Sequence, residues 1–189
     1  MSETAHELGD DPELGALVEE HGPLTLEPAT DTFRRFVASV IAQQVSTAAA
    51  ESIRKRVFDS FEITPETIAA ADRSALQAAG LSKQKAEYVT HIAEAYLEYG
   101  YDRAYFAGMD DEAVIEELTE IHGVGTWTAK MFLIFCLGRK DVFPVEDLGV
   151  RNGMQQLYGD LSRTEMCEVA ERWRPHRSYA ALYLWKAGD

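Results

Sequence analysis

The segment of residues 122–129, which reads HGVGTWTA, constrains the fold of this 189-residue chain more than any other. Its two glycines, Gly123 and Gly125, stand between two stretches of helical pattern, residues 112–120 and 130–137. Glycine adopts backbone conformations closed to residues that carry a side chain, so the pair permits a very tight hairpin between two helices. The first amides of the second helix then lack internal partners and lie at the positive end of its dipole. We therefore expect an anion site at this hairpin.

The remaining chain is also patterned for helices. Apolar residues recur at helical spacing from Phe33 to Ile41 and from Ala86 to Leu97. A Ser, Thr or Asp precedes most helical stretches, and the expected N-caps are Asp31, Ser46, Thr64, Asp72, Ser82 and Ser162. No segment shows the alternation of a strand. We therefore predict an all-α protein of about ten helices with short connections.

Composition limits the partner and the compartment. Hydrophobic residues make up 46% of the chain, as in a soluble globular protein. The longest unbroken apolar run, residues 131–137, is too short to cross a bilayer. The acidic N-terminus does not have the pattern of a secretory signal, so we expect a cytoplasmic protein without a membrane partner. The two cysteines, Cys136 and Cys167, have no metal-ligand spacing and are expected to be free thiols.

The net charge of −14 argues at first against a nucleic-acid partner. The chain has 32 acidic and 18 basic residues, and only six of the basic ones are lysine. An acidic, lysine-poor surface is also how a halophilic protein stays soluble in strong salt, and we hypothesise such a source. Strong salt screens long-range attraction to phosphate, so nucleic-acid binding would then depend on short-range backbone contacts, stacking and insertion.

Three further features accompany the hairpin. Trp127 lies between two threonines directly after it, an acid stands at Asp147, and residues 173–179 read WRPHRSY. Together these residues resemble the helix-hairpin-helix DNA glycosylase superfamily, specifically the 3-methyladenine DNA glycosylase II (AlkA) type. The resemblance extends from about Phe33 to Trp185.

The fold that this resemblance implies has two helical lobes with a cleft between them. Lobe 1 would contain residues 30–44 and 148–189, and lobe 2 would contain residues 45–147. Residues 1–29 would form an acidic, partly ordered N-terminal segment. In this arrangement Asp147 is expected at the mouth of the cleft.

The resemblance assigns the catalytic role to Asp147. A glycosylase rotates a nucleotide out of the duplex, and the sugar develops positive charge as the base departs. A carboxylate below the sugar stabilises that charge and orients or deprotonates the attacking water. One acid suffices when the leaving base is already cationic. The simpler interpretation of Asp147 is a helix N-cap, and Glu146 is the neighbouring alternative.

Trp127 indicates the subtype. In bifunctional members of the superfamily a lysine at this position attacks the sugar as a Schiff base. Lys130 lies about one helical turn further on and is expected to point elsewhere, so the resemblance implies no AP lyase activity. Trp127 and Trp185 match aromatic residues of the family's base pocket, where electron-rich rings bind a cationic base. Met131 would line the same wall. Core packing is the open alternative for all three.

The resemblance also implies two kinds of DNA contact. Gln43 and Gln44 end a helix as the family's insertion element does, with Gln44 as the wedge that fills the gap and Gln43 as its neighbour; a solvated helix end is the alternative. Contacts to the DNA backbone are implied, by amides or side chains, at Gly123, Gly125, Thr126, Ser82, Lys83 and Arg151. Lys83 could equally be an ordinary surface residue, and Arg151 could instead order its own loop.

No cofactor is required for this chemistry. By resemblance, the backbone carbonyls of Thr119, Ile121 and Val124 would hold a monovalent cation, K⁺ or Na⁺. His122 stands where the family commonly has proline, and we expect it to be exposed near the DNA backbone.

The sequence thus predicts a monomeric, monofunctional DNA glycosylase. It would remove alkylated, mainly cationic bases such as 3-methyladenine and 7-methylguanine from damaged double-stranded DNA and so initiate base excision repair. Two alternatives stay open: a non-catalytic helix-hairpin-helix DNA-binding module, and a glycosylase for uracil or oxidised bases. Asp147 and the two tryptophans argue against the first. The second needs a hydrogen-bonding readout that we do not locate.

Overall fold

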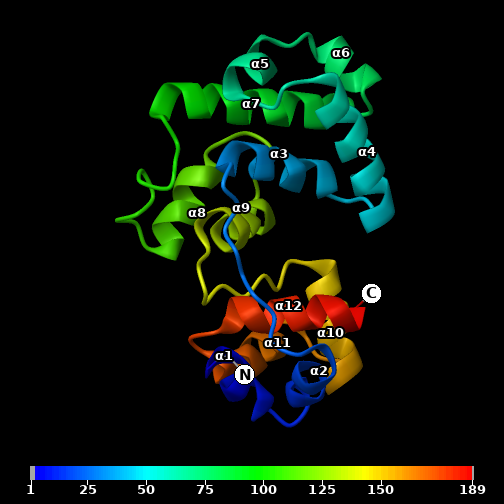
Figure 1. Ribbon diagram of the computed structural model, residues 1–189, viewed down its shortest axis with the longest axis vertical. Helices are drawn as coiled ribbons and strands as arrows, with labels where there is room; N and C mark the ends of the chain where they lie inside the picture. Colours follow the sequence, from blue (N-terminus) through cyan, green and yellow to red (C-terminus); the bar gives the residue numbers. More distant parts are fainter. Residues whose placement is uncertain (1–2, 189) are drawn as a thin grey trace. The chain divides into compact units, whose positions relative to one another are not determined.

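The structure is a computed structural model that describes residues 3–188, and every regular element in that range is helical (Figure 1). The elements are α1 (Glu3–Gly9), α2 (Leu14–His21), α3 (Thr32–Ala42), α4 (Thr47–Ser60), α5 (Pro65–Ala70), α6 (Arg73–Ala78), α7 (Lys83–Tyr99), α8 (Asp111–Thr119), α9 (Thr126–Phe132), the π-helical η1 (Leu133–Leu137), α10 (Leu148–Tyr158), α11 (Arg163–Ala170), the 3₁₀ turn η2 (Glu171–Trp173) and α12 (Arg177–Gly188). The predicted all-α class is confirmed. The described range holds twelve α-helices rather than about ten, partly because the acidic N-terminal stretch contains two.

The predicted helix starts are confirmed by the capping contacts. All six expected N-cap side chains accept a hydrogen bond from a backbone amide in the first turn of the helix that follows. At Ser162 the cap is reciprocal, because the Glu165 side chain also accepts from the Ser162 amide. Each such cap stabilises a helix by about 1 kcal/mol, so these starts are determined by residues within three positions of one another.

The chain divides into two compact units. Within the described range, unit 1 contains residues 3–28 and 138–188, and unit 2 contains residues 29–137. This division differs from the expected lobes at both boundaries. Residues 30–44 belong to unit 2, because the apolar face of α3 packs on α7 and α9 there. Residues 138–147 belong to unit 1, because side chains of α10 and α12 bind their backbone.

Unit 2 is built around α3. This helix contacts α4, α7, α9 and η1, while α5 and α6 pack along α7 (Figure 1). A run of aromatic rings forms the centre of the core: Phe36 lies 4.9 Å from Phe132 and 6.4 Å from Tyr96, and Phe106 lies 5.3 Å from Phe132. Burial of these rings, together with that of the aliphatic side chains of this unit, drives its folding, and edge-to-face contacts add to it.

The N-terminal segment, expected to be only partly ordered, contributes two helices to the core of unit 1. Leu8, Leu14 and Val18 are buried against the helices of the C-terminal third, and α2 packs on α12. The physical reason is the spacing of these leucines and valines, which places them on the inner sides of α1 and α2 although acids surround them in the sequence.

Asp11 joins the N-terminal segment to the rest of unit 1. Its side chain is only 6% exposed. Its Oδ1 accepts hydrogen bonds from the Glu13 amide (3.1 Å), the Leu14 amide (3.0 Å) and the Tyr158 hydroxyl (2.7 Å), and its Oδ2 accepts one from the Trp173 indole (3.0 Å). Burial opposes the charged form of Asp11, but these hydrogen bonds together outweigh burial and hold its pKa below the ordinary value of 3.8.

Asp11→Asn is expected to destabilise unit 1 in a pH-dependent way. Because the folded-state pKa is depressed, the stabilisation is complete above the unfolded-state pKa and is lost as the pH falls through the folded-state value. Near neutral pH the loss should be about 1–3 kcal/mol, the cost of removing hydrogen bonds to a buried charge. Urea unfolding of both proteins from acid to neutral pH measures it. A difference between them that does not change with pH would contradict this assignment.

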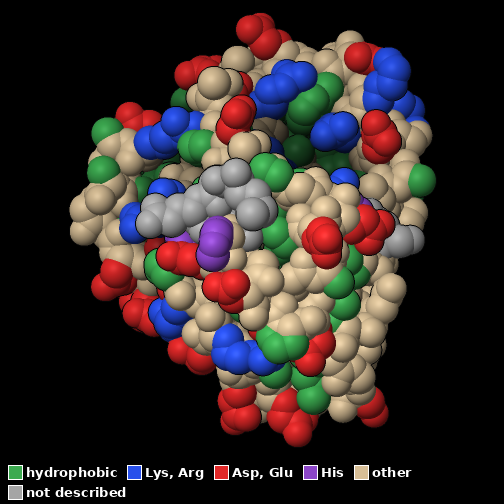
Figure 2. Space-filling view, turned by 60° about the horizontal axis from the view of Figure 1, so that its bottom comes forward, with side chains coloured by type: hydrophobic (Ala, Val, Ile, Leu, Met, Phe, Trp, Pro, Cys, Tyr) green, Lys and Arg blue, Asp and Glu red, His purple; other side chains and the backbone are tan. Residues whose placement is uncertain are grey.

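The charged residues do not gather on one side of the molecule seen in Figure 2, where acidic and basic side chains are interspersed. Among residues 3–188, none of the helices combines the length and the apolar character needed to span a membrane.

Candidate functional site

In unit 1 the predicted catalytic carboxylate is held by two donors. Asp147 is the N-cap of α10, and its Oδ1 accepts a hydrogen bond from the Val150 amide (3.0 Å). The same oxygen accepts a second hydrogen bond from the indole N–H of Trp185 on α12 (2.8 Å). Asp147 is half-buried, and the two donors from different helices fix its orientation. The N-cap interpretation is therefore correct for Asp147, and it is compatible with a further role because the cap orients the carboxylate.

The loop before Asp147 is fixed through its backbone. Arg151, one turn into α10, donates from Nη1 to the carbonyls of Val145 (3.3 Å) and Glu146 (2.7 Å). Of the two roles considered for Arg151, the structure shows that it orders this loop. Because the loop leads directly into Asp147, these contacts also limit where the carboxylate can lie.

The start of the same loop is bound by α12. The buried Ser178 hydroxyl accepts from the Val142 amide (2.9 Å) and donates to the Arg139 carbonyl (2.7 Å). Arg177 binds the Asp141 carboxylate through Nε (2.7 Å) and Nη2 (3.2 Å), which is a bidentate pair. The segment 139–147 is therefore attached to α10 and α12 at several points along its length.

Glycines allow α10 and α12 to approach closely enough for the Trp185–Asp147 hydrogen bond. A Cβ at Gly153 would lie 2.3 Å from the Leu184 carbonyl oxygen. A Cβ at Gly149 would lie 2.8 Å from Trp185 Cδ1 and 3.2 Å from Asp147 Oδ1. The sequence analysis missed this role. The signal was present, because two glycines four residues apart in a predicted helix cost stability unless another backbone passes close by.

Gly153→Ala is expected to destabilise unit 1 despite the better helix propensity of alanine. The added methyl group meets a backbone oxygen, which cannot rotate away, and overpacking of this kind costs about 1–3 kcal/mol. Chemical denaturation measures the change in the free energy of unfolding. Gly108→Ala is the matched control, because nothing lies within 4 Å of a Cβ at that position. Equal stability of the two variants would contradict the close approach of α10 and α12.

In unit 2 the hairpin between α8 and α9 depends on Gly123. Its φ of +98° lies in the left-handed region, and a Cβ there would lie 2.1 Å from the ring of Tyr88. The expectation that both glycines adopt backbone conformations closed to other residues is wrong for Gly125. Its φ is −98°, and it precedes α9 as a cap without a side chain. Of the two glycines, only Gly123 has a left-handed φ. A Cβ at Gly125 would meet nothing within 4 Å.

The side chains around the hairpin are partly exposed. Thr126 and His122 are exposed, and the His122 ring lies 5.4 Å from both Tyr88 and His91. Trp127 is half-buried in the first turn of α9, and the predicted pocket residue Met131 is buried one turn later on the same helix. Trp127 and Met131 thus lie together in unit 2, while Trp185 lies against Asp147 in unit 1.

The predicted insertion residues behave differently from each other. The Gln43 side chain donates to the Gly123 carbonyl (3.2 Å) and to Thr128 Oγ1 (2.8 Å), so it connects the end of α3 to the hairpin. Gln44 is exposed and has a φ of +55°, a conformation that costs a non-glycine residue about 1–2 kcal/mol. The backbone therefore presents the Gln44 side chain outward, while Gln43 supports the turn.

Lys85, which the sequence analysis did not single out, holds the end of α3. Its ammonium donates to the carbonyls of Ile41 (2.7 Å) and Gln43 (2.6 Å), where the helix leaves carbonyl groups without internal partners. Burial lowers the pKa of Lys85. Ser82 is the N-cap of α7 and accepts from the Lys85 amide, while Lys83 is exposed. The support given by Lys85 depends on contacts about 40 residues apart and has no local signal.

The predicted cation ligands lie at the turn after α8. Thr119 is the last residue of α8, so its carbonyl is at the negative end of that helix. The Ile121 carbonyl already accepts from the Val124 amide (3.0 Å), which leaves one lone pair of that oxygen for another partner. Backbone carbonyls at the end of a helix fit a monovalent cation chemically. Among residues 3–188 there is no cluster of three or more His, Cys, Asp or Glu side chains that could hold a metal ion.

Comparison with known proteins adds the context for this geometry. The family described as "HhH-GPD superfamily base excision DNA repair protein" matches residues 37–175. The chain is 38% identical over 186 residues to the DNA-3-methyladenine glycosylase of Saccharomyces cerevisiae, covering 92% of this chain and 62% of that protein. It is 30% identical to YfjP of Bacillus subtilis, covering 92% of this chain and 65% of that protein. The chain thus spans less than two thirds of the length of either relative.

A solved structure is similar along nearly the whole chain. The 3-methyladenine DNA glycosylase Mag1 of Schizosaccharomyces pombe, in complex with abasic DNA, has a TM-score of 0.90 and 30% sequence identity. The alignment covers 98% of this chain and 96% of the Mag1 chain.

Proposed function

The chain belongs to the HhH-GPD superfamily of base excision DNA repair proteins, and on that premise we propose that it is a monofunctional DNA glycosylase. It hydrolyses the N-glycosidic bond of alkylated, mainly cationic bases, such as 3-methyladenine and 7-methylguanine, in double-stranded DNA, and it acts as a monomer. The observation that carries the proposal is the Asp147 carboxylate, oriented by the Val150 amide and the Trp185 indole at the start of α10.

The chemistry follows from a carboxylate at a fixed position. When the glycosidic bond breaks, its electron pair leaves with the base, and a cationic base departs as a neutral molecule without prior protonation. The positive charge that develops on the deoxyribose is stabilised by Asp147. Water then attacks the anomeric carbon and gives up its proton with Asp147 as the general base. The products are the free base and an abasic site.

Substrate binding is assigned from the resemblance to the family. Trp127 and Trp185 provide electron-rich rings for a cationic base, with Met131 beside Trp127. Gln44 fills the gap that the flipped nucleotide leaves in the duplex. The exposure of its side chain and its left-handed φ support that role. The amides of Gly123, Gly125 and Thr126 bind a DNA phosphate, with a further contact at Ser82 and Lys83. A monovalent cation on the carbonyls of Thr119, Ile121 and Val124 would offset the carbonyl dipoles beside that phosphate.

The absence of AP lyase activity rests on Trp127. A Schiff base needs an amine at the reacting carbon, and an indole cannot form one. The nearest lysine in the sequence, Lys130, lies in the last turn of α9. We therefore expect strand cleavage only after alkali treatment of the product.

One assay tests the proposed function. The protein is incubated with methylated genomic DNA, and the released bases are separated by chromatography. A parallel incubation contains borohydride from the start, so that any Schiff base between protein and sugar is reduced as it forms. Release of 3-methyladenine and 7-methylguanine without a borohydride-trapped adduct is the expected result. Binding without release would indicate a non-catalytic module, and release of uracil or oxidised bases alone would indicate another substrate class. A trapped covalent adduct would contradict the monofunctional mechanism.

A further inference from the structure

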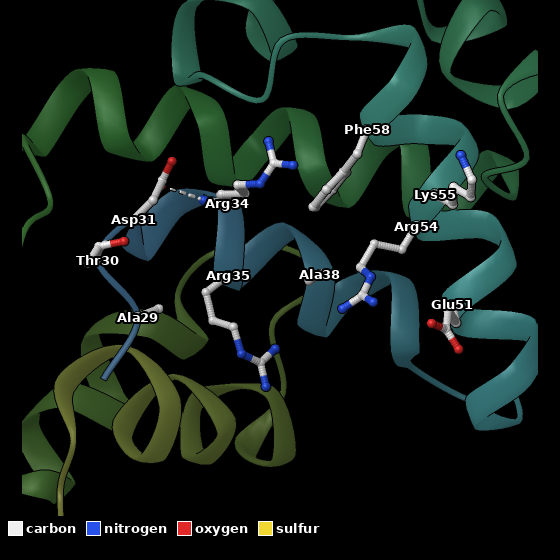
Figure 3. A pocket seen from close by; sticks show the side chains of 10 residues that line it. All are labelled: Ala29, Thr30, Asp31, Arg34, Arg35, Ala38, Glu51, Arg54, Lys55 and Phe58. Carbon is white, nitrogen blue, oxygen red and sulfur yellow. Dashed lines mark hydrogen bonds between the residues drawn. The ribbon is translucent and has the colours of Figure 1, made fainter. Parts of the chain in front are cut away.

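Unit 2 contains a cavity of about 560 Å³ that is lined by α3, α4 and the segment before α3 (Figure 3). Neither the hairpin nor Gln44 contributes to its lining. Four of its ten lining residues are basic, namely Arg34, Arg35, Arg54 and Lys55. This concentration is unusual in a chain with 32 acidic and only 18 basic residues.

Two of the three arginines of the cavity, Arg34 and Arg35, are held in place by aromatic rings. The guanidinium of Arg34 lies 4.2 Å from the centre of the Phe58 ring. The guanidinium of Arg35 lies 4.3 Å from the centre of the Phe135 ring and donates to Ser39 Oγ (3.0 Å). Over residues 3–188, no carboxylate forms a salt bridge with Arg34, Arg35 or Arg54. Aromatic faces and a hydroxyl position Arg34 and Arg35, but they do not neutralise these cations.

Two acids of the lining, Asp31 and Glu51, offset part of this charge, but neither forms a salt bridge with the three arginines in the described part of the chain. Asp31 is the N-cap of α3 and accepts from the Arg34 amide (2.8 Å). Glu51 is exposed at the edge formed by α4 and forms no salt bridge with the three arginines. Lys55 is paired with Asp59 (2.6 Å) and contributes little net charge. The positive charge of the lining that has no salt-bridge partner among residues 3–188 therefore comes from the three arginines.

The surroundings of Arg35 make an anion favourable. Burial is the largest effect on the Arg35 guanidinium and lowers its pKa. Cys136 has the next largest effect and raises this pKa, while the charge of Arg54 has a smaller effect and lowers it. Arg35 and Arg54 both line the cavity. Figure 3 shows Arg54 extending from α4 toward α3, and Arg35 extending from α3 toward η1, where its guanidinium lies over the Phe135 ring. An anion placed in the cavity would neutralise two cations that otherwise repel each other in a partly buried place.

We propose that this cavity is a phosphate site separate from the hairpin, in which Arg35 and Arg54 bind one oxyanion beside the wall formed by Arg34 and Phe58. The planar fork of a guanidinium matches the oxygens of a phosphate in geometry as well as in charge. The group is a phosphate ester, supplied either by a DNA strand or by a free phosphate compound. The site would exist whether or not the protein excises bases.

Titration with inorganic phosphate tests the site, with KCl added to keep the ionic strength constant. Saturable changes in the amide NMR signals of Ala38 and Phe58, two residues of the lining, are expected in the wild type. Arg54→Gln should weaken phosphate binding by roughly tenfold or more, the usual effect of losing a charged hydrogen bond. Arg54 is exposed and donates no hydrogen bond to the described part of the chain, so this variant should fold normally, which its unfolding midpoint verifies.

Arg163→Gln is the matched control, because it removes the same charge from an exposed position in the first turn of α11. Its phosphate affinity should equal that of the wild type. The proposal is overturned if the wild type shows no saturable change at Ala38 and Phe58, or if Arg54→Gln and Arg163→Gln bind phosphate equally well.

The source of the phosphate is then decided with a short undamaged duplex and with 5′-AMP. If Arg54→Gln binds the duplex more weakly than Arg163→Gln does, the site takes a phosphate of a DNA strand. If the two variants bind the duplex equally while Arg54→Gln loses 5′-AMP, the site takes a free phosphate compound. Either result supports the site, and neither depends on base release.

Discussion

Asp147→Asn is expected to bind damaged DNA like the wild type. Its rate of alkylated-base release should be about one thousandth of the wild-type rate or lower, because the charge that stabilises the sugar cation is lost. Asparagine has the shape of aspartate and is an equally good N-cap. Its side-chain oxygen can accept both the Val150 amide and the Trp185 indole, so the two hydrogen bonds to position 147 are retained. The variant therefore separates the structural role of the residue from its charge.

Single-turnover base release from methylated DNA measures this effect, and binding of an abasic duplex is measured in parallel. Glu146→Gln is the matched control, because it removes the neighbouring carboxylate and keeps the backbone carbonyl that accepts from Arg151. Full activity of Asp147→Asn would refute the catalytic assignment. Loss of activity in Glu146→Gln alone would transfer the role to Glu146.

Gly123→Ala is expected to destabilise unit 2 by about 2–5 kcal/mol, a large fraction of the stability of a typical domain. The alanine must adopt a left-handed φ, and its methyl group must displace the Tyr88 ring, which would lie 2.1 Å away. Thermal and urea unfolding measure the loss. When Gly123→Ala is combined with Tyr88→Ala, the loss of stability caused by the clash with the ring should disappear, while the loss caused by the left-handed φ should remain.

Gly125→Ala is the contrasting substitution in the same hairpin. Its methyl group meets open space, so the free energy of unfolding should change little. Affinity for duplex DNA should nevertheless fall, because the methyl group would stand beside the amides proposed to bind phosphate. Equal stability of Gly123→Ala and Gly125→Ala would contradict the described turn, and unchanged DNA affinity of Gly125→Ala would contradict a phosphate contact at this glycine.

Several parts of the fold were predictable because they depend on short stretches of sequence. The six N-caps each combine a polar residue with an amide two or three positions later, and all six are present. The family was recognisable from residues 122–129, Asp147 and the segment 173–179, and the match to residues 37–175 confirms it. The proposed roles of these residues in catalysis and DNA binding stay predictions until the variants above are measured.

Other features had no local signal. The α3 helix was assigned to the wrong side of the division of the chain, because amphipathic spacing shows that a helix has an apolar face but not which helices cover it. The hydrogen bond from Trp185 to Asp147 joins residues 38 positions apart. The three arginines of the cavity come from two helices, and only the tertiary structure shows that no carboxylate of residues 3–188 forms a salt bridge with them.

The sequence by itself determined the helical class, the helix starts, the glycine turn at residues 123–125 and the family. Each of these follows from interactions between residues close in the chain or from a compact motif. The tertiary structure alone decided that α3 packs in unit 2, that Lys85 and Gln43 support the turn at Gln44, that glycines bring Trp185 to Asp147, and that Arg35 and Arg54 share a cavity. These contacts join distant segments, and their energies depend on burial and distance, which a linear pattern does not contain.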